Sequence, residues 1–210
     1  MKMKKLVAML AAGILCLGMS TTAFAAISPN DPVGTDKDGN VIVKPNDKPL
    51  SVDEQEVLDY AIDHLRGDEA AVTLKNLGFD VPYNAEVIVI GTEDYVYTGE
   101  GNMKPGTEIN FNLSAWAEGR NLRAGDQIIL LHAVRKADGS IGFEKQLVTV
   151  KWDKDAKIFY ATGKLDSLSP VSFIKVMQDG TLVRYNEDGE IVAKSSPKGT
   201  TVKVSPKTGE

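Results

Sequence analysis

The chain has 210 residues, 25% of them charged, and a formal net charge of −5 at pH 7. This length is enough for one well-packed core or two small ones. The acidic balance disfavours nucleic acid as a partner, because an acidic surface repels phosphate backbones.

Residues 1–25 predict a secretory signal peptide. Three lysines stand among the first five residues, an apolar run of about 14 residues follows, and Ala23 and Ala25 fit the small-x-small cleavage pattern. The run is shorter than the roughly 20 residues that cross a bilayer as a helix. We therefore expect a secreted chain that begins at Ala26. It would lose the single cysteine, Cys16, and with it any disulfide, cysteine nucleophile or thiolate metal site. Loss of three lysines would move the net charge from −5 to about −8.

Residues 26–50 predict a disordered linker. Four prolines are spread among Asn, Asp and Gly residues, with too little apolar surface to offset the entropy of ordering. The run 41–43 is the one stretch there with the character of a short strand.

A single amphipathic helix is expected to open the folded part. Ser51 and Glu54 have the spacing of a capping box. Beyond them, an apolar stripe at helical spacing ends before Gly67. The stripe consists of Leu58, Ala61, Ile62 and Leu65.

Short runs with β character follow as far as residue 193. Asp-Gly dipeptides separate several of them, as in tight hairpins. The run 128–131 is apolar on both faces and predicts a central strand. Helices between the runs, which a parallel sheet needs, are missing, so we predict an antiparallel β-sandwich over residues 51–193. The expected strands are 71–75, 85–91, 95–98, 108–113, 127–134, 142–152, 157–162, 171–177, 181–185 and 190–193.

The two tryptophans receive different predictions. Val148, Val150 and Trp152 alternate with polar residues, which predicts that all three face the core. Trp116 is expected in a loop, where its replacement would cost much less than that of Trp152.

The run from Asn121 to His132 places a Gly-Asp turn directly before an apolar strand, and Leu168-Ser169-Pro170-Val171-Ser172-Phe173 closes the pattern. This succession resembles a module of Gram-positive cell-surface proteins that carries a Leu-x-Ala-Gly-Asp turn and a Ser-Pro-Val-x-Phe strand. The resemblance covers about residues 71–177. It implies an Ig-like β-sandwich and no settled activity.

Residues 194–210 predict a disordered polar tail. Its end is similar to the Ser-Pro-x-Thr-Gly variant of the sortase recognition motif. The resemblance implies a sortase-type transpeptidase as partner, with this chain as its substrate, and a place in the cell wall or on the cell surface. Such signals continue with an apolar span, and the resemblance stops at Glu210, so anchoring and release both stay open. The motif residues are Ser205, Pro206, Lys207, Thr208 and Gly209.

No pattern in the chain names a reaction. The two histidines lie too far apart in the sequence to suggest a zinc site. We expect His64 to be a surface or boundary residue of its helix and His132 to be a hydrogen-bonded residue at the rim of a sheet. We therefore predict no catalytic residues, no metal, no cofactor and no membrane span after the signal peptide. The leading hypothesis is a structural or interaction module that binds a surface protein or glycan. A carbohydrate-binding module is the alternative, with Tyr95, Tyr97 and Trp116 as candidate sugar contacts. An enzyme acting through paired carboxylates is the third hypothesis, and no spacing favours one pair.

Overall fold

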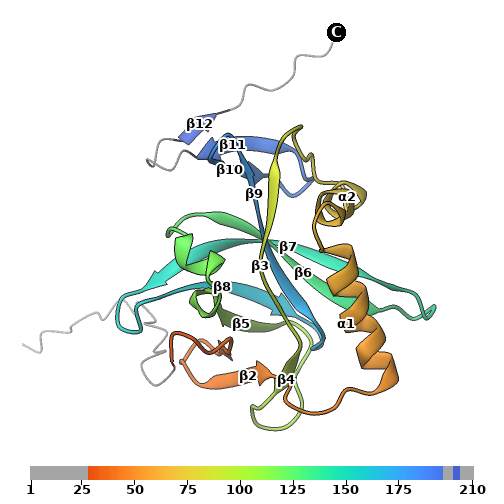
Figure 1. Ribbon diagram of the computed structural model, residues 1–210. Helices are drawn as coiled ribbons and strands as arrows, with labels where there is room; N and C mark the ends of the chain where they lie inside the picture. Colours follow the sequence, from red (N-terminus) through yellow and green to blue (C-terminus); the bar gives the residue numbers. More distant parts are fainter. Residues whose placement is uncertain (1–27, 196–200, 204–210) are drawn as a thin grey trace, which may run out of the picture.

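The computed structural model describes residues 28–195 and 201–203, and these form a mostly β fold, as the sequence predicts, with two α-helices where the sequence predicts one (Figure 1). The Ig-like identity of the sandwich stays a prediction. The helices are α1 (Val52–His64) and α2 (Glu69–Asn76), and the 3₁₀ turns are η1 (Leu113–Ala115) and η2 (Glu118–Asn121). The strands are β1 (Gly34–Thr35), β2 (Val41–Pro45), β3 (Glu86–Glu93), β4 (Tyr95–Tyr97), β5 (Thr107–Asn112), β6 (Gln127–Arg135), β7 (Ile141–Asp153), β8 (Ile158–Leu165), β9 (Val171–Gln178), β10 (Thr181–Tyr185), β11 (Ile191–Ser195) and β12 (Thr201–Lys203).

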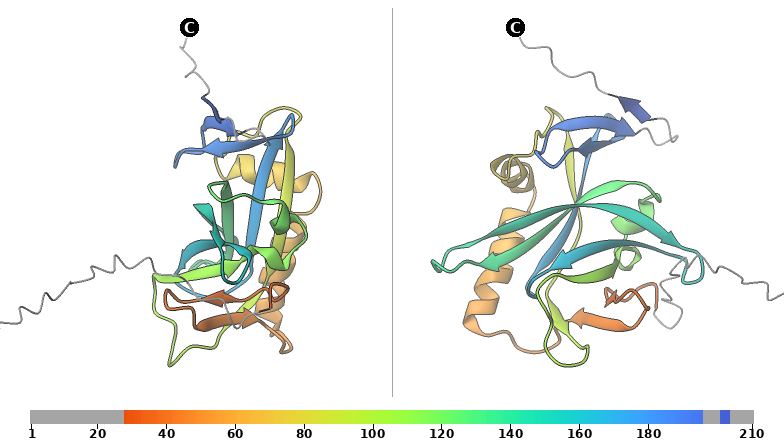
Figure 2. Two further views of the ribbon diagram at one scale, coloured as in Figure 1. Left: turned by 90° about the vertical axis from the view of Figure 1, so that its left-hand side faces the viewer. Right: turned by 180° about the vertical axis from the view of Figure 1, so that it is seen from behind.

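Two antiparallel layers share the long strand β7. Residues 141–149 of β7 pair with β6, whereas residues 150–153 pair with β8. From β8 the first layer continues through β5, β1, β2 and β4. From β6 the second layer continues through β9, which also pairs with β3 and β10, and it ends in β11 and β12. Figure 2 shows β2 at one end of the molecule and β10, β11 and β12 at the other.

The central strand β6 is buried on both faces, as its apolar run predicts. Ile128 and Leu130 belong to the core between the two layers. Ile129 and Leu131 belong to a second core, beneath α2. Because successive side chains of a strand point to opposite faces, one run supplies both cores.

The prediction of a disordered linker over residues 26–50 is wrong for the described residues from 28 onward. Strand β1 pairs with β5, and β2 pairs with β4, so this segment extends the first layer. Thr35 and Val43 are fully buried, and Ile42 is 8% exposed. Three buried side chains and a set of sheet hydrogen bonds order a segment whose composition is otherwise that of a linker.

The strand predicted over 71–75 is also wrong, since these residues belong to α2. Ala70, Thr73 and Leu74 form its buried face, which has helical rather than alternating spacing. Leu74 packs in the second core. A short apolar run fits either period, and the tertiary contact selects the helix.

The first helix begins as predicted and buries a slightly different face. Both halves of the capping box between Ser51 and Glu54 are present. Val57 and Ala61 are buried, whereas Ile62 is 47% exposed. The buried stripe is therefore rotated by about one residue from the predicted one.

The predicted core position of Trp152 is wrong. Val148 and Val150 are buried, but Trp152 is 42% exposed and Asp153 is buried in its place. The alternation shifts beyond Val150, the first residue of β7 that pairs with β8. The Asp153 carboxylate accepts hydrogen bonds from two backbone N–H groups of the following turn, which accounts for its burial.

Candidate functional site

A cleft of about 350 Å³ lies where the first turn of α1 meets the ends of β4 and β6 and the loop between β8 and β9. Its lining includes three carboxylates, a guanidinium, a serine hydroxyl and an apolar side chain from α1. These side chains are Asp53, Glu54, Val57, Asp94, Arg135 and Ser169.

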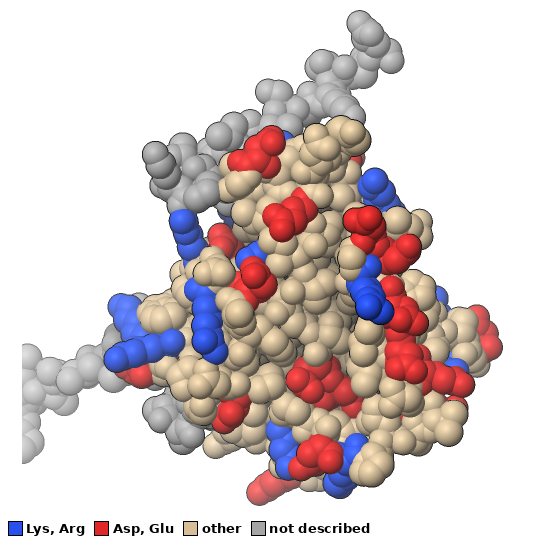
Figure 3. All heavy atoms as spheres, in the orientation of Figure 1, with Lys and Arg blue, Asp and Glu red and all other residues tan. Residues whose placement is uncertain are grey.

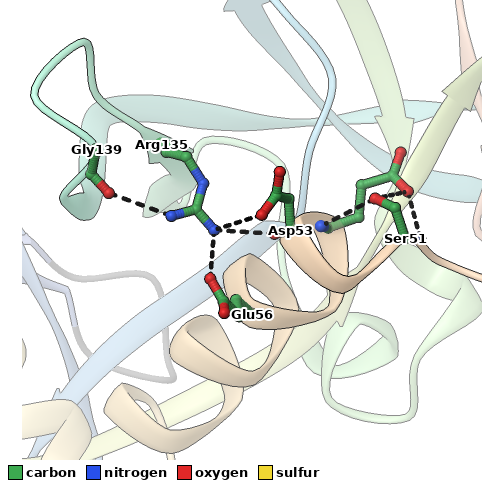
Figure 4. Close-up of polar contacts among 6 residues, drawn as sticks. Ser51, Asp53, Glu56, Arg135 and Gly139 are labelled. Carbon is green, nitrogen blue, oxygen red and sulfur yellow. Dashed lines mark hydrogen bonds and ion pairs between the residues drawn. The ribbon is translucent and has the colours of Figure 1, made fainter.

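The first turn of α1 is fixed by its capping box. The Ser51 Oγ accepts a hydrogen bond from the Glu54 backbone N–H, and the Glu54 carboxylate accepts one from the Ser51 N–H at 2.7 Å (Figure 4). These bonds satisfy N–H groups that have no partner within the helix. They also hold the Glu54 side chain at the edge of the cleft. The pKa of the Glu54 carboxyl is lowered by the hydrogen bonds that it accepts from the Ser51 hydroxyl and from the Ser51 backbone N–H.

Arg135 joins this turn to the end of β6. Its Nη2 lies 2.6 Å from the Glu56 carboxylate and 3.8 Å from that of Asp53, and its Nη1 donates to the Gly139 carbonyl (Figure 4). The Arg135 side chain is about two-thirds buried. A planar fork with several donors suits this bridging role.

The facing wall carries the half-buried carboxylate of Asp94, and the half-buried carboxyl of the preceding residue, Glu93, lies outside the lining. Asp94 accepts a hydrogen bond from the Asn46 amide at 2.9 Å. Burial raises the pKa of both carboxyls, and the charge of Glu54 adds to the effect on Asp94. In the described part of the chain no Lys or Arg pairs with Asp94 or Glu54. The cleft therefore presents acidic groups that protein cations do not neutralise.

Behind the cleft, a hydrogen-bonded chain links three strands. The His132 ring is fully buried, with Nδ1 3.1 Å from the Glu144 carboxylate and Nε2 2.6 Å from the Ser169 Oγ. The Ser169 hydroxyl donates to the carbonyl of Ala133. Burial lowers the pKa of His132, against the opposing effect of Glu144.

This order of residues has the connectivity of a Ser-His-acid triad. A serine nucleophile donates its hydrogen to the imidazole, whereas the Ser169 hydroxyl also contacts the Ala133 carbonyl, which can only accept a hydrogen bond. The prediction that His132 is hydrogen-bonded is confirmed, and the chain ties β6 to β7 and to the start of β9.

The three aromatic residues predicted as sugar contacts do not form one exposed surface. Tyr95 is 2% exposed and packs against Phe111 inside the core, with the ring planes inclined at 53°, so it offers no face to a sugar. Tyr97 and Trp116 are partly buried and pack against the same core. Trp116 lies over Gly91 and Phe173. Burial raises the pKa of Tyr95, as expected for a phenol without water around it.

The predicted signal cleavage site and the predicted sortase motif both fall outside the described residues. Ala23, Ala25 and Ala26 and the motif from Ser205 to Gly209 lie outside them. In the described ranges no cluster of three His, Cys, Asp or Glu side chains could hold a metal ion. Over the same ranges no helix has the length and apolarity needed to cross a membrane.

Sequence reasoning missed the cleft because its parts come from distant segments. Asn46, Glu54, Asp94, Arg135 and Ser169 have no common spacing, and only the capping box gave a local signal. Comparisons of the chain with family models, curated proteins and solved structures found no match.

Proposed function

We propose that the protein is an exported, non-catalytic interaction module of the cell surface, and that its cleft receives a cationic group from an extracellular partner. The observation that carries the binding role is the pair of unneutralised carboxylates, Asp94 and Glu54, in a cleft that also has an apolar side. An ammonium or guanidinium group would gain charge-assisted hydrogen bonds there. The stem that bears it would cover Val57.

The export part of the proposal rests on the sequence. It is supported by the basic and apolar start of the chain and by the resemblance of residues 205–209 to a sortase motif. The test is fractionation of cells that produce the protein. Recovery in the wall fraction, with Ala26 as the first residue, supports the proposal. Recovery in the cytoplasm with residues 1–25 attached contradicts it.

The cleft is tested by NMR titration with a blocked Gly-Lys-Gly peptide. We expect shifts at the backbone amides around Asn46, Asp94 and Ser169, with no response to the same peptide carrying norleucine. Asp94→Asn combined with Glu54→Gln should abolish the shifts. Glutamine retains the capping interaction at its position. Glu108→Gln on β5 is the matched control, because this exposed acid lies away from the cleft. Equal shifts with lysine and norleucine would show that charge has no role.

Carbohydrate binding remains the second candidate function, on the strength of a different observation. The exposed Trp152 supplies a flat aromatic face that the three aromatics first considered do not.

A further inference from the structure

A second pocket, of about 360 Å³, lies at the opposite end of β8 from the cleft. It opens between the β7–β8 turn, η2 and the first described residues of the chain. With about 3.3 Å per residue along a strand, the eight residues of β8 place the two pockets roughly 25 Å apart. The lining residues on which the argument depends are Asn30, Ser114, Arg120, Trp152, Lys157 and Phe159.

Two aromatic rings form the apolar wall of this pocket. Trp152 and Phe159 are cross-strand neighbours, with ring centroids 4.7 Å apart and planes inclined at 54°. Trp152 remains 42% exposed after this contact. An aromatic face of this kind binds the C–H face of a pyranose ring, since it offers a large contact area at little cost in conformational entropy.

The polar rim is partly preorganised. Arg120 donates from Nε to the Ser114 carbonyl at 2.9 Å and from Nη2 to the Asn30 Oδ1 at 2.7 Å. The Ser114 Oγ accepts from the backbone N–H of Phe159 at 2.8 Å. These bonds fix the guanidinium beside the aromatic wall without neutralising its charge.

Lys157 adds a second positive charge. It has a left-handed backbone conformation, with φ of 57°, at the end of the β7–β8 turn. Its ammonium group has no ion-pair partner in the described part of the chain, and no carboxylate side chain lines the pocket. Figure 3 shows Lys and Arg side chains gathered at the end of the molecule where β7 and β8 meet, whereas acidic side chains follow α1. This pocket is thus locally basic on an acidic protein.

We propose that this pocket is a binding site for an acidic saccharide. A sugar ring would stack on Trp152, and its carboxylate would lie between Arg120 and Lys157, with Asn30 at its hydroxyl groups. The aromatic wall selects for a sugar ring, and the two cations select for an acidic one. The site is independent of the acidic cleft, so either one can fail without the other.

The test is titration of the secreted protein with a hyaluronan tetrasaccharide, followed through the indole N–H of Trp152 by NMR. Chitotetraose serves as the neutral comparison, and inorganic sulfate as the comparison for simple anion binding. We expect the acidic tetrasaccharide to bind about tenfold more tightly than the neutral one, the factor for a single well-placed charge contact.

Three variants separate the roles of the ring and the charge, and two more serve as controls. Trp152→Ala should weaken both saccharides about tenfold, whereas Trp152→Phe should retain most of the binding. Lys157→Asn should weaken only the acidic saccharide, and asparagine tolerates the left-handed conformation at this position. Tyr83→Ala and Lys154→Asn are the controls, because Tyr83 is 88% exposed elsewhere and Lys154 lies outside the pocket.

The proposal is overturned if Trp152→Ala binds the acidic saccharide as the parent does, or if chitotetraose binds equally well. It is also overturned if sulfate displaces the tetrasaccharide from the parent and Trp152→Ala has no effect, since the pocket would then be a simple anion site. Thermal melts of each variant establish that a loss of binding is not a loss of fold.

Discussion

Gly91 leaves room for the indole of Trp116, and replacing it with alanine should dislodge that ring. A Cβ at Gly91 would lie 2.2 Å from Cε2 of Trp116 and 2.3 Å from Cδ2. Because the indole also packs on Phe173, with centroids 5.8 Å apart, it cannot move without losing that contact. The sequence predicts a small cost for replacing Trp116, and this packing leads to the opposite expectation.

The cost can be worked out from the packing. Overpacking of this kind costs about 1–3 kcal/mol of the free energy of unfolding. Trp116→Ala should cost about 3 kcal/mol, the lower end of the range for core tryptophans, because the ring is only partly buried. In the double variant the clash is absent, so the alanine at position 91 should then cost less than about 1 kcal/mol. The coupling between the two substitutions should therefore be about 1–2 kcal/mol, within the range found for residues in contact.

The assay is denaturant unfolding of the parent, the two single variants and the double variant, followed by near-UV circular dichroism and tryptophan fluorescence. A domain with about 5–15 kcal/mol in total should still fold in all four cases. Trp152→Ala is the control, and it should cost less than Trp116→Ala. A neutral Gly91→Ala, or strictly additive costs, would refute the packing argument.

Three further predictions concern the first layer, the cleft and the buried histidine. Val43→Ala should cost about 1.5–3 kcal/mol of unfolding free energy, because the side chain is fully buried. Val41→Ala, at an exposed position of the same strand, should cost less than about 0.5 kcal/mol. Equal and small effects of the two substitutions in denaturant unfolding would restore the linker interpretation. Asp94→Asn should raise the melting temperature at pH 7, because burial raises the pKa of this carboxyl and its ionised form therefore destabilises the folded state. The gain should fade as the pH falls below about 4, where this carboxyl is also protonated in the unfolded chain. A melting temperature below that of the parent at pH 7 would contradict the prediction. The parent should lose stability as the pH falls below about 6.5, because burial lowers the pKa of His132 and the unfolded state then binds more protons than the folded state. His132→Gln should flatten this pH dependence of the melting temperature in calorimetry. An unchanged pH dependence, or an equal flattening by His64→Gln, would assign the effect to other groups.

Most of the strands could be predicted from the sequence because they carry a clear period. Strand β5 alternates, β6 is apolar on both faces, and Asp179-Gly180 supplies the two left-handed residues of the β9–β10 turn. The capping box located the start of α1 to the residue. These signals are local, so they survive without knowledge of the partner strand.

The incorrect predictions concern segments whose structure depends on contacts with another part of the chain. Residues 71–75 are too few to distinguish a helical from a strand period. Trp152 keeps the period of β7 in the sequence, but β7 pairs with β8 from Val150 onward, and the exposed side of the strand changes beyond that residue. In β1 and β2 a few buried residues bring a polar segment into the sheet. No composition rule separates such a segment from a linker that lacks a neighbouring strand.

The candidate sites show the same limit more strongly. The acidic cleft joins side chains separated by as many as about 120 positions, from Asn46 to Ser169, and the basic pocket joins Asn30 to Lys157. Both depend on which strand ends meet. Aromatic content alone suggested sugar binding, and it pointed to residues that the fold buries or packs against the core.

The attachment of β10, β11 and β12 to the second layer determines how the protein would respond to a pulling force. These strands are hairpins, and β10 meets β9 through only two residue pairs. Tension applied at β12 would peel residue pairs apart one after another instead of shearing many at once. The peeling would meet its first strong obstacle at Tyr185, whose backbone N–H and carbonyl are both held by the Gln127 amide. Under tension from this end, β10, β11 and β12 would unfold and extend the chain at low force, while the sheet formed by β3, β9 and β6 would stay folded.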